Sequence, residues 1–176
     1  KLLVAEGDKV LAGDALFYDK AHPEVMFTSP VSGTISAVRR GAKRKLLAIE
    51  VAADAEQNYK PFNINLASAS REEVVAALLQ SGLWATIMQR PYGIMADSKD
   101  TPKAIFVSAF DSAPLAPDYN FVLASEKENI EAGMAVLGRL TEGKVHLSAR
   151  KGAEGFMAEV KGVEYHTFSG KHPVGN

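Results

Sequence analysis

The hydrophobic pattern of the chain changes between residues 53 and 62, and this change constrains the fold more than any other feature of the sequence. Before it, short apolar runs rich in Val, Ile and Phe alternate with turn residues, and no helical periodicity is sustained. After it, helix-start signals and apolar residues at helical spacing appear. The sequence therefore predicts an all-β domain over residues 1–53, followed by an α/β domain over residues 54–176.

Two related turn patterns divide the β segment into half-repeats. The first is Gly7-Asp8, which recurs as Gly13-Asp14, and the second is Ser29-Pro30 followed by an apolar strand. Together these patterns resemble the biotinyl/lipoyl family of small barrel-sandwich domains, whose two halves present a carrier lysine on the hairpin between them. The resemblance implies a barrel-sandwich fold for residues 1–53.

The position of the carrier residue tests this resemblance. In the biotin-carrier pattern the turn proline lies sixteen residues after the position of Asp14, and Pro30 fits that register. The carrier lysine would lie nine residues after Asp14, where this chain has Pro23, and Lys20 comes three positions too early. Since proline cannot carry biotin or lipoate, we expect a non-carrier module. A carrier domain, the alternative, would need a modified lysine near residue 23.

The second segment begins with a capping box at Ser70 and Glu73, which predicts a helix start. Gly82 is suited to the end of this helix. An apolar run over residues 103–111 predicts a buried strand, and residues 144–148 predict another. Between them, a second capping box at Ser125 and Glu128 predicts a helix that closes at Gly143. Strand, helix and strand in this order indicate a Rossmann-like α/β domain with parallel strands.

Composition excludes several classes of function. Without cysteine the chain has no disulfide, no thiolate nucleophile and no thiolate ligands for zinc or an iron–sulfur cluster. A net charge of −1 provides no global attraction for nucleic acid. The longest apolar run covers six residues, 74–79, whereas a membrane span needs about 18. A start without Met and without a signal peptide suggests a piece of a longer protein.

Six short sequence blocks follow one another along the chain, and both the blocks and their order are informative. They lie at residues 40–44, 81–84, 90–92, 104–116, 141–145 and 170–175. In that order they resemble the A subunit of the sodium-translocating NADH:quinone oxidoreductase, a bacterial respiratory complex. The resemblance covers nearly the whole chain but less than half of such a subunit. It implies a peripheral subunit on the cytoplasmic side of the bacterial inner membrane, in contact with partner subunits that include an integral membrane subunit.

The resemblance also has implications for cofactors. The family carries no flavin or iron–sulfur cluster of its own, so FMN, FAD and iron–sulfur centres are expected in partner subunits, with quinone as substrate. Flavin-binding relatives, such as the NADH-oxidising subunit of complex I, use a glycine-rich loop that lets the backbone approach the flavin. The corresponding segment here, residues 81–93, retains only Gly82 and Gly93. Its bulky side chains would occupy the flavin volume, which argues against FMN.

The same segment supplies a candidate quinone site. A quinone ring needs apolar walls and one or two polar donors at its edge. Candidate walls and donors occur within nine residues: Trp84, Ile87, Met88, Gln89, Arg90 and Tyr92. A cation such as Arg90 beside a quinone carbonyl would stabilise the reduced anion. The alternative is that the aromatic side chains belong to the domain core and Arg90 pairs with a carboxylate.

A second candidate site is a run of five cations within seven residues: Arg39, Arg40, Lys43, Arg44 and Lys45. Such a run is typical of a solvated hairpin tip. The functional alternative is docking onto an acidic protein face or onto anionic lipid head groups. Because no aromatic side chains are interleaved with the cations, nucleic acid is not expected as a partner.

The remaining residues do not suggest catalysis by this chain alone. Its four histidines, at 22, 146, 166 and 172, are scattered and lack a partner at helical spacing, so no metal site is predicted. No dinucleotide fingerprint or nucleophile elbow is present, so NADH is not expected to bind and no catalytic residue is assigned. We therefore expect a non-flavin subunit that contributes to quinone binding or reduction, while partner subunits export Na+. A purely structural scaffold in the same complex is the alternative.

Overall fold

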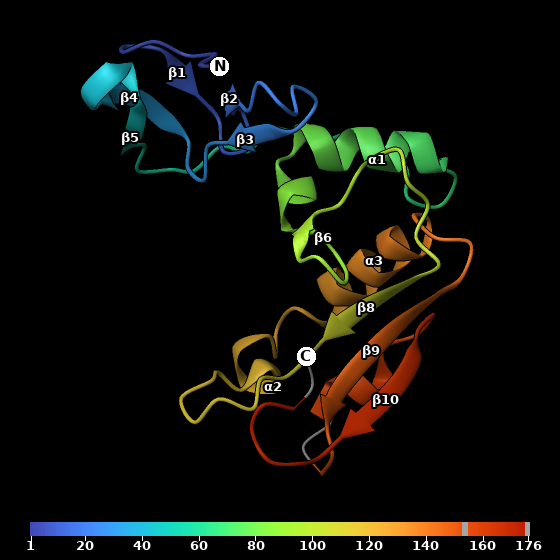
Figure 1. The fold of residues 1–176 in the computed structure, drawn as a ribbon. Helices are drawn as coiled ribbons and strands as arrows, with labels where there is room; N and C mark the ends of the chain where they lie inside the picture. Colours follow the sequence, from blue (N-terminus) through green and yellow to red (C-terminus); the bar gives the residue numbers. More distant parts are fainter. Residues whose placement is uncertain (153–154, 175–176) are drawn as a thin grey trace. The chain divides into compact units, whose positions relative to one another are not determined.

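The computed structural model describes residues 1–152 and 155–174 (Figure 1). It separates into two compact units. The first contains Lys1–Ile64 and Val75–Ser98, and the second contains Asn65–Val74 and the described residues from Lys99 onward. This division groups residues 75–98 with the β segment. The domain boundary expected from sequence, at residue 53, stays a prediction.

The first unit is built from short antiparallel strands, as the turn-rich sequence predicts. Its strands are β1 (Lys9–Val10), β2 (Ala15–Tyr18), β3 (Met26–Thr28), β4 (Gly33–Arg40) and β5 (Leu46–Ala53). One sheet has the order β1-β4-β5, and β2 pairs with β3. The short 3-10 helix η1 (Ala42–Arg44) connects β4 to β5. The core of these strands is formed by Val10, Leu16 and Ile35.

The two Gly-Asp turns of the first half-repeat have similar local geometry. Asp8 Oδ2 accepts a hydrogen bond of 2.8 Å from the amide of Ala5, and Asp14 Oδ2 accepts one of 2.8 Å from the amide of Leu11. Gly7 and Gly13 adopt φ values of +93° and +98°, a region that side chains disfavour. Both aspartates therefore close turns.

The hairpin between β2 and β3 contains the position that a carrier lysine would occupy. Pro23 lies there and is exposed, as is Lys20 in the same connection. The carboxylate of Asp19 accepts a hydrogen bond of 3.0 Å from the amide of Ala21, which shapes the bend. The chain thus has the hairpin that the resemblance implies, with proline at its carrier position.

Helix α1 (Arg71–Gln80) begins with the predicted capping box. Ser70 Oγ accepts a hydrogen bond of 3.2 Å from the Glu73 amide, and Glu73 Oε2 accepts one of 2.8 Å from the Ser70 amide. The chain leaves the helix through Gly82, whose φ is +80°. A Cβ at Gly82 would lie 3.1 Å from the carbonyl oxygen of Met26, so both conformation and space favour glycine.

The second unit contains a parallel sheet of order β10-β9-β8 (Figure 1). Its strands are β8 (Ala104–Ser108), β9 (Lys144–Arg150) and β10 (Glu164–Phe168). The helices are α2 (Tyr119–Val122), α3 (Lys127–Gly138) and the 3-10 segment η3 (Gly155–Glu159). Parallel pairing of β8 with β9 confirms the predicted strand-helix-strand unit. The sequence does not predict β10.

One face of this sheet forms the core of the second unit. Val145, Leu147 and Ala149 alternate along β9 and are buried. Val145 and Leu147 pack with Met134 of α3 and Met157 of η3. The opposite face is accessible, as the 76% exposure of Phe106 in β8 shows. The prediction that residues 103–111 form a fully buried strand is therefore wrong, because β8 is an edge strand with one exposed face.

The predicted ends of the second helix also need correction. Helix α3 begins at Lys127 with Glu126 as N-cap, and no side chain caps it. The amide of Glu126 donates to the carbonyl of Leu123 at 2.9 Å in the turn that follows α2, so Ser125 precedes the cap position and the second capping box does not form. The helix ends at Gly138. Gly143 is needed for another reason, since a Cβ there would overlap the carbonyl oxygen of Lys103.

None of the helices in the described part of the chain has the length and apolar character required to cross a membrane.

Candidate functional site

The predicted quinone segment folds into the 3-10 helix η2 (Leu83–Thr86) and a hairpin of two short strands, β6 (Met88–Gln89) and β7 (Ile94–Met95). Trp84 is buried, with 3% of its surface exposed. Its indole Nε1 donates a hydrogen bond of 2.8 Å to the carbonyl oxygen of Ala96. Both the ring and its polar atom are therefore accommodated by the first unit itself.

The other predicted residues occupy a different environment. Met88 is 53% exposed and Tyr92 is 77% exposed, and Arg90 is also exposed. Ile87 and Gln89 are half-buried. The structure thus divides the predicted set between a buried tryptophan and an open hairpin surface.

The hairpin surface combines exposed apolar side chains with a cation. In addition to Met88 and Tyr92, Ile94 of β7 is 56% exposed, and so is Leu83 of the preceding η2. The hairpin is closed by a hydrogen bond of 2.9 Å from the Gly93 amide to the Gln89 carbonyl, with Gly93 at φ +64°. Exposed apolar side chains of this kind can lie against a flat ring or a partner protein.

The five clustered cations lie at the tip of the β4–β5 hairpin, and all five are exposed. Arg39 pairs with Glu50 across the hairpin, with Nε–Oε1 and Nη2–Oε2 distances of 2.8 and 3.2 Å. Arg40 Nη1 donates to the carbonyl oxygen of Arg44 at 3.2 Å. Lys43 and Arg44 have positive φ values of 53° and 61°, so the connection is a tight turn.

The Arg39–Glu50 pair has a defined dependence on pH. The hydrogen bond between the two side chains raises the pKa of Arg39 and lowers the pKa of Glu50. Because folding lowers the pKa of Glu50, the pair stabilises the hairpin fully at pH values above the pKa that Glu50 has in the unfolded chain. That contribution is lost as the pH falls through the folded-state pKa. The other basic side chains at this tip present their charges to solvent.

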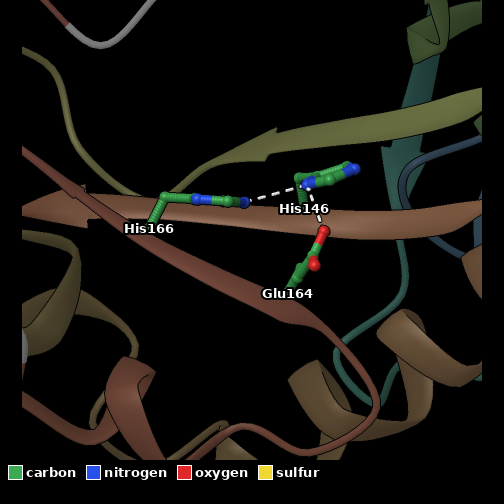
Figure 2. A group of neighbouring side chains, drawn as sticks. All are labelled: His146, Glu164 and His166. Carbon is green, nitrogen blue, oxygen red and sulfur yellow. Dashed lines mark hydrogen bonds and ion pairs between the residues drawn. The ribbon is translucent and has the colours of Figure 1, made fainter.

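The parallel pairing of β9 and β10 creates a cluster that sequence reasoning missed. Glu164 lies opposite His146, and His166 lies two residues further along β10, so the three side chains share one face of the sheet. His146 Nδ1 lies 2.9 Å from His166 Nε2 and 3.2 Å from Glu164 Oε2 (Figure 2). The spacing of Glu164 and His166 is visible in the sequence, but β10 and its register are not.

Neighbouring side chains hold this cluster in place. The ring of Phe106 stacks on His146, with centroids 4.9 Å apart and planes at 15°. Lys144 Nζ donates to Glu164 Oε1 at 2.7 Å, and this hydrogen bond holds the pKa of Glu164 below its ordinary value. The side chain of His146 is 19% exposed and that of Glu164 is 42% exposed. The cluster is thus ordered by its neighbours and open to solvent.

Two family models match the chain, one after the other. The model described as the NqrA N-terminal barrel-sandwich hybrid domain matches residues 1–54. The model described as the NqrA second alpha/beta domain matches residues 69–176. The two descriptions agree with the β-rich first segment and with the α/β second segment.

The chain is also similar to longer proteins that are named as the A subunit of Na(+)-translocating NADH-quinone reductase. It is 41% identical to the protein of Serratia proteamaculans over an alignment of 179 positions, which covers 99% of this chain and 40% of that protein. It is 42% identical to the protein of Yersinia pestis, with the same coverage. The Neisseria meningitidis protein is 41% identical over 98% of the chain and 39% of its own length. The chain therefore spans about 40% of the length of these relatives.

Proposed function

The chain belongs to the NqrA family, and from this membership we propose that it functions as part of the NqrA component of a Na+-translocating NADH-quinone reductase. The observation that carries the proposal is the consecutive match of two NqrA domain models, together with about 41% identity to the named relatives along almost the entire chain. The six sequence blocks support the same assignment. The last of them ends at Gly175, which lies outside the described residues.

In this proposal the chain is a peripheral, non-flavin component on the cytoplasmic side of the bacterial inner membrane. Partner subunits, including an integral membrane subunit, carry FMN, FAD and the iron–sulfur centres and export Na+. The absence of cysteine from the sequence supports this division, because iron–sulfur clusters are held mainly by cysteine thiolates. This chain contributes to quinone binding and reduction and docks on its partners.

An exchange of segments tests the role in the complex. The 176 residues would replace the matching segment of a relative's full-length NqrA, produced together with the other subunits. We expect the hybrid to co-purify with them and to support Na+-dependent quinone reduction by NADH. A hybrid in which Lys43, Arg44 and Lys45 are replaced by glutamine should co-purify less if the basic hairpin docks. A hybrid that is folded but never co-purifies would contradict the assignment.

The proposed quinone contact is the surface of the β6–β7 hairpin, with Arg90 as the donor and Met88 and Tyr92 as the apolar contacts. Exposure of all three side chains supports this, because a quinone can reach them without opening the core. Arg90 would stabilise negative charge that develops on a quinone carbonyl oxygen during reduction. A second role, as a structural scaffold, is favoured by Trp84, which the fold itself uses as a buried and hydrogen-bonded core residue.

A fluorescence titration separates these two roles. Trp84 is the only tryptophan, so its emission reports on this segment. Titration with a short-chain quinone, corrected for inner-filter absorption, should quench the emission saturably. The Arg90→Ala variant should weaken the apparent affinity, whereas Arg44→Ala, at another exposed arginine on the other hairpin, should not. Linear quenching that is equal in all three proteins would exclude a quinone contact here and leave the scaffold role.

A further inference from the structure

Three side chains with metal-ligand chemistry converge on the accessible face of the second unit's sheet. His146 comes from β9, and Glu164 and His166 come from β10. Backbone pairing aligns the two strands in parallel along their shared length, with Glu164 opposite His146 and His166 opposite Ser148. The positions of all three Cα atoms are therefore set by the sheet and not by a loop. Sites built on paired strands hold their ligands more precisely than sites built on loops.

The donor atoms are spaced as ligands of one ion would be. His146 Nδ1 lies 2.9 Å from His166 Nε2 and 3.2 Å from Glu164 Oε2, and one ligand atom from each residue can be chosen so that all three lie within 4.8 Å of one another. Zinc–nitrogen and zinc–oxygen bonds of about 2.0–2.2 Å at tetrahedral angles place neighbouring donors about 3.3–3.5 Å apart. Small side-chain rotations would therefore produce tetrahedral spacing.

From this geometry we propose that His146, Glu164 and His166 bind one divalent transition-metal ion, with Zn2+ as the best match. Two imidazole nitrogens and one carboxylate oxygen suit zinc and its neighbours, whereas Mg2+ and Ca2+ prefer sites made of oxygen. Three protein ligands leave a fourth tetrahedral position for water or for a group from a partner. This site is independent of the quinone and docking proposals.

The contacts in the cluster are difficult to satisfy with protons alone. His146 Nδ1 is the nitrogen shared by both short contacts, and it can carry only one hydrogen. If it accepts a hydrogen from His166, its lone pair is occupied and it offers no hydrogen to Glu164 Oε2, while Oε1 of the same carboxylate accepts from Lys144. If it donates, a single hydrogen must serve two acceptors. A cation bound between the three groups would accept a lone pair from each of the three ligand atoms, and no shared hydrogen would be needed.

The surroundings of the cluster orient the three ligands. Phe106 stacks on the His146 ring, and the His146 and His166 rings meet through their nitrogens with centroids 5.1 Å apart and planes at 25°. Lys144 bonds to Glu164 Oε1, which leaves Oε2 on the side of His146. Partners of this kind orient the side chains that bind a metal and tune its affinity. The ammonium group of Lys144 also opposes a bound cation, so we expect modest rather than very tight affinity.

Calorimetry on the chain without a polyhistidine tag tests the proposal. Titration with ZnCl2 at neutral pH should reveal one saturable site per chain. Loss of a residue that only orients a metal ligand lowers metal affinity by roughly tenfold or more. Loss of a direct ligand should lower it at least as much. We therefore expect His146→Gln and His166→Gln each to weaken Zn2+ binding by at least about tenfold. Glu164→Gln should weaken it as well. His22→Gln, on the exposed β2–β3 hairpin of the other unit, is the matched control and should leave affinity unchanged.

Two further measurements keep the test decisive. Circular dichroism must show that each variant is folded. Co2+ added in place of Zn2+ should give the visible absorption of a tetrahedral complex in the parent chain and in His22→Gln, but not in His146→Gln or His166→Gln. A tenfold excess of Mg2+ should not displace the bound ion. Three results would overturn the proposal: non-saturable heats with the parent chain, an affinity in His146→Gln and His166→Gln equal to that of the parent chain, or a loss of affinity in His22→Gln as large as theirs.

Discussion

Replacement of Trp84 by alanine is expected to lower the free energy of unfolding of the first unit by about 3–5 kcal/mol. The side chain is 3% exposed, so its removal leaves a large cavity as well as losing apolar burial. The same change leaves the carbonyl oxygen of Ala96 without the indole N–H that now donates to it. Loss of a partner for such a group adds to the cost of the cavity.

Two control variants separate the contributions to this loss of stability. Trp84→Phe keeps most of the ring volume but removes the N–H, so it should cost less than the alanine change. Tyr92→Ala removes an aromatic side chain that is 77% exposed on the neighbouring hairpin and should cost no more than about 0.5 kcal/mol. Urea unfolding followed by far-UV circular dichroism suits all three variants, since the two Trp84 variants lack the tryptophan reporter. Equal stability of Trp84→Ala and Tyr92→Ala would contradict the core role.

Such destabilisation makes Trp84 variants poor probes of quinone binding. A chain that is destabilised by several kcal/mol would lose ligand binding whether or not the indole touches the ligand. The exposed Arg90 is the better probe, because its removal should leave the fold unchanged. Fluorescence from an intact Trp84 can then be compared directly between the parent and Arg90→Ala.

Leu147→Ala should have an effect of similar size in the second unit, about 2–5 kcal/mol. Leu147 is fully buried at the centre of β9, and it belongs to the cluster that includes Met134 of α3 and Met157 of η3. Its removal leaves a cavity between the sheet and these elements. The size of the loss depends on how far those two flexible methionine side chains can fill the space.

Phe106→Ala is the matched control, because Phe106 lies on the opposite, accessible face of the same sheet and is 76% exposed. It should cost less than about 1 kcal/mol, mainly through loss of its stacking on His146. Amide hydrogen exchange along β9 measures the stability of this unit separately, which matters because a chain of two units need not unfold in one step. Similar losses for Leu147→Ala and Phe106→Ala would contradict this assignment of the two faces.

Features that depend on neighbouring residues were predicted well from the sequence. The capping box of Ser70 and Glu73, the turns closed by Asp8 and Asp14, and the alternating burial of β9 all involve contacts within a few residues. The second capping box failed because the turn after α2 uses the amide of Glu126, and the composition of residues 125–128 does not reveal this contact.

The candidate quinone segment, residues 84–92, shows what composition could indicate and what it could not. Its composition predicted a quinone site of apolar and polar side chains, and that assignment stays a prediction; the structure shows that Met88, Arg90 and Tyr92 are exposed. Composition alone could not show that Trp84 turns inward. That depends on the carbonyl of Ala96, which β7 brings back beside η2.

Patterns in the amino-acid sequence were sufficient to predict the β-rich and α/β segments, the proline at the carrier position, and the family, which the domain models confirm. They did not reveal that β10 exists, that it pairs in parallel with β9, or that two distant histidines and Glu164 therefore meet. The reason is physical, because local patterns are set by contacts between residues close in the chain. Register between parallel strands is instead set by packing of the whole sheet against α3 and η3.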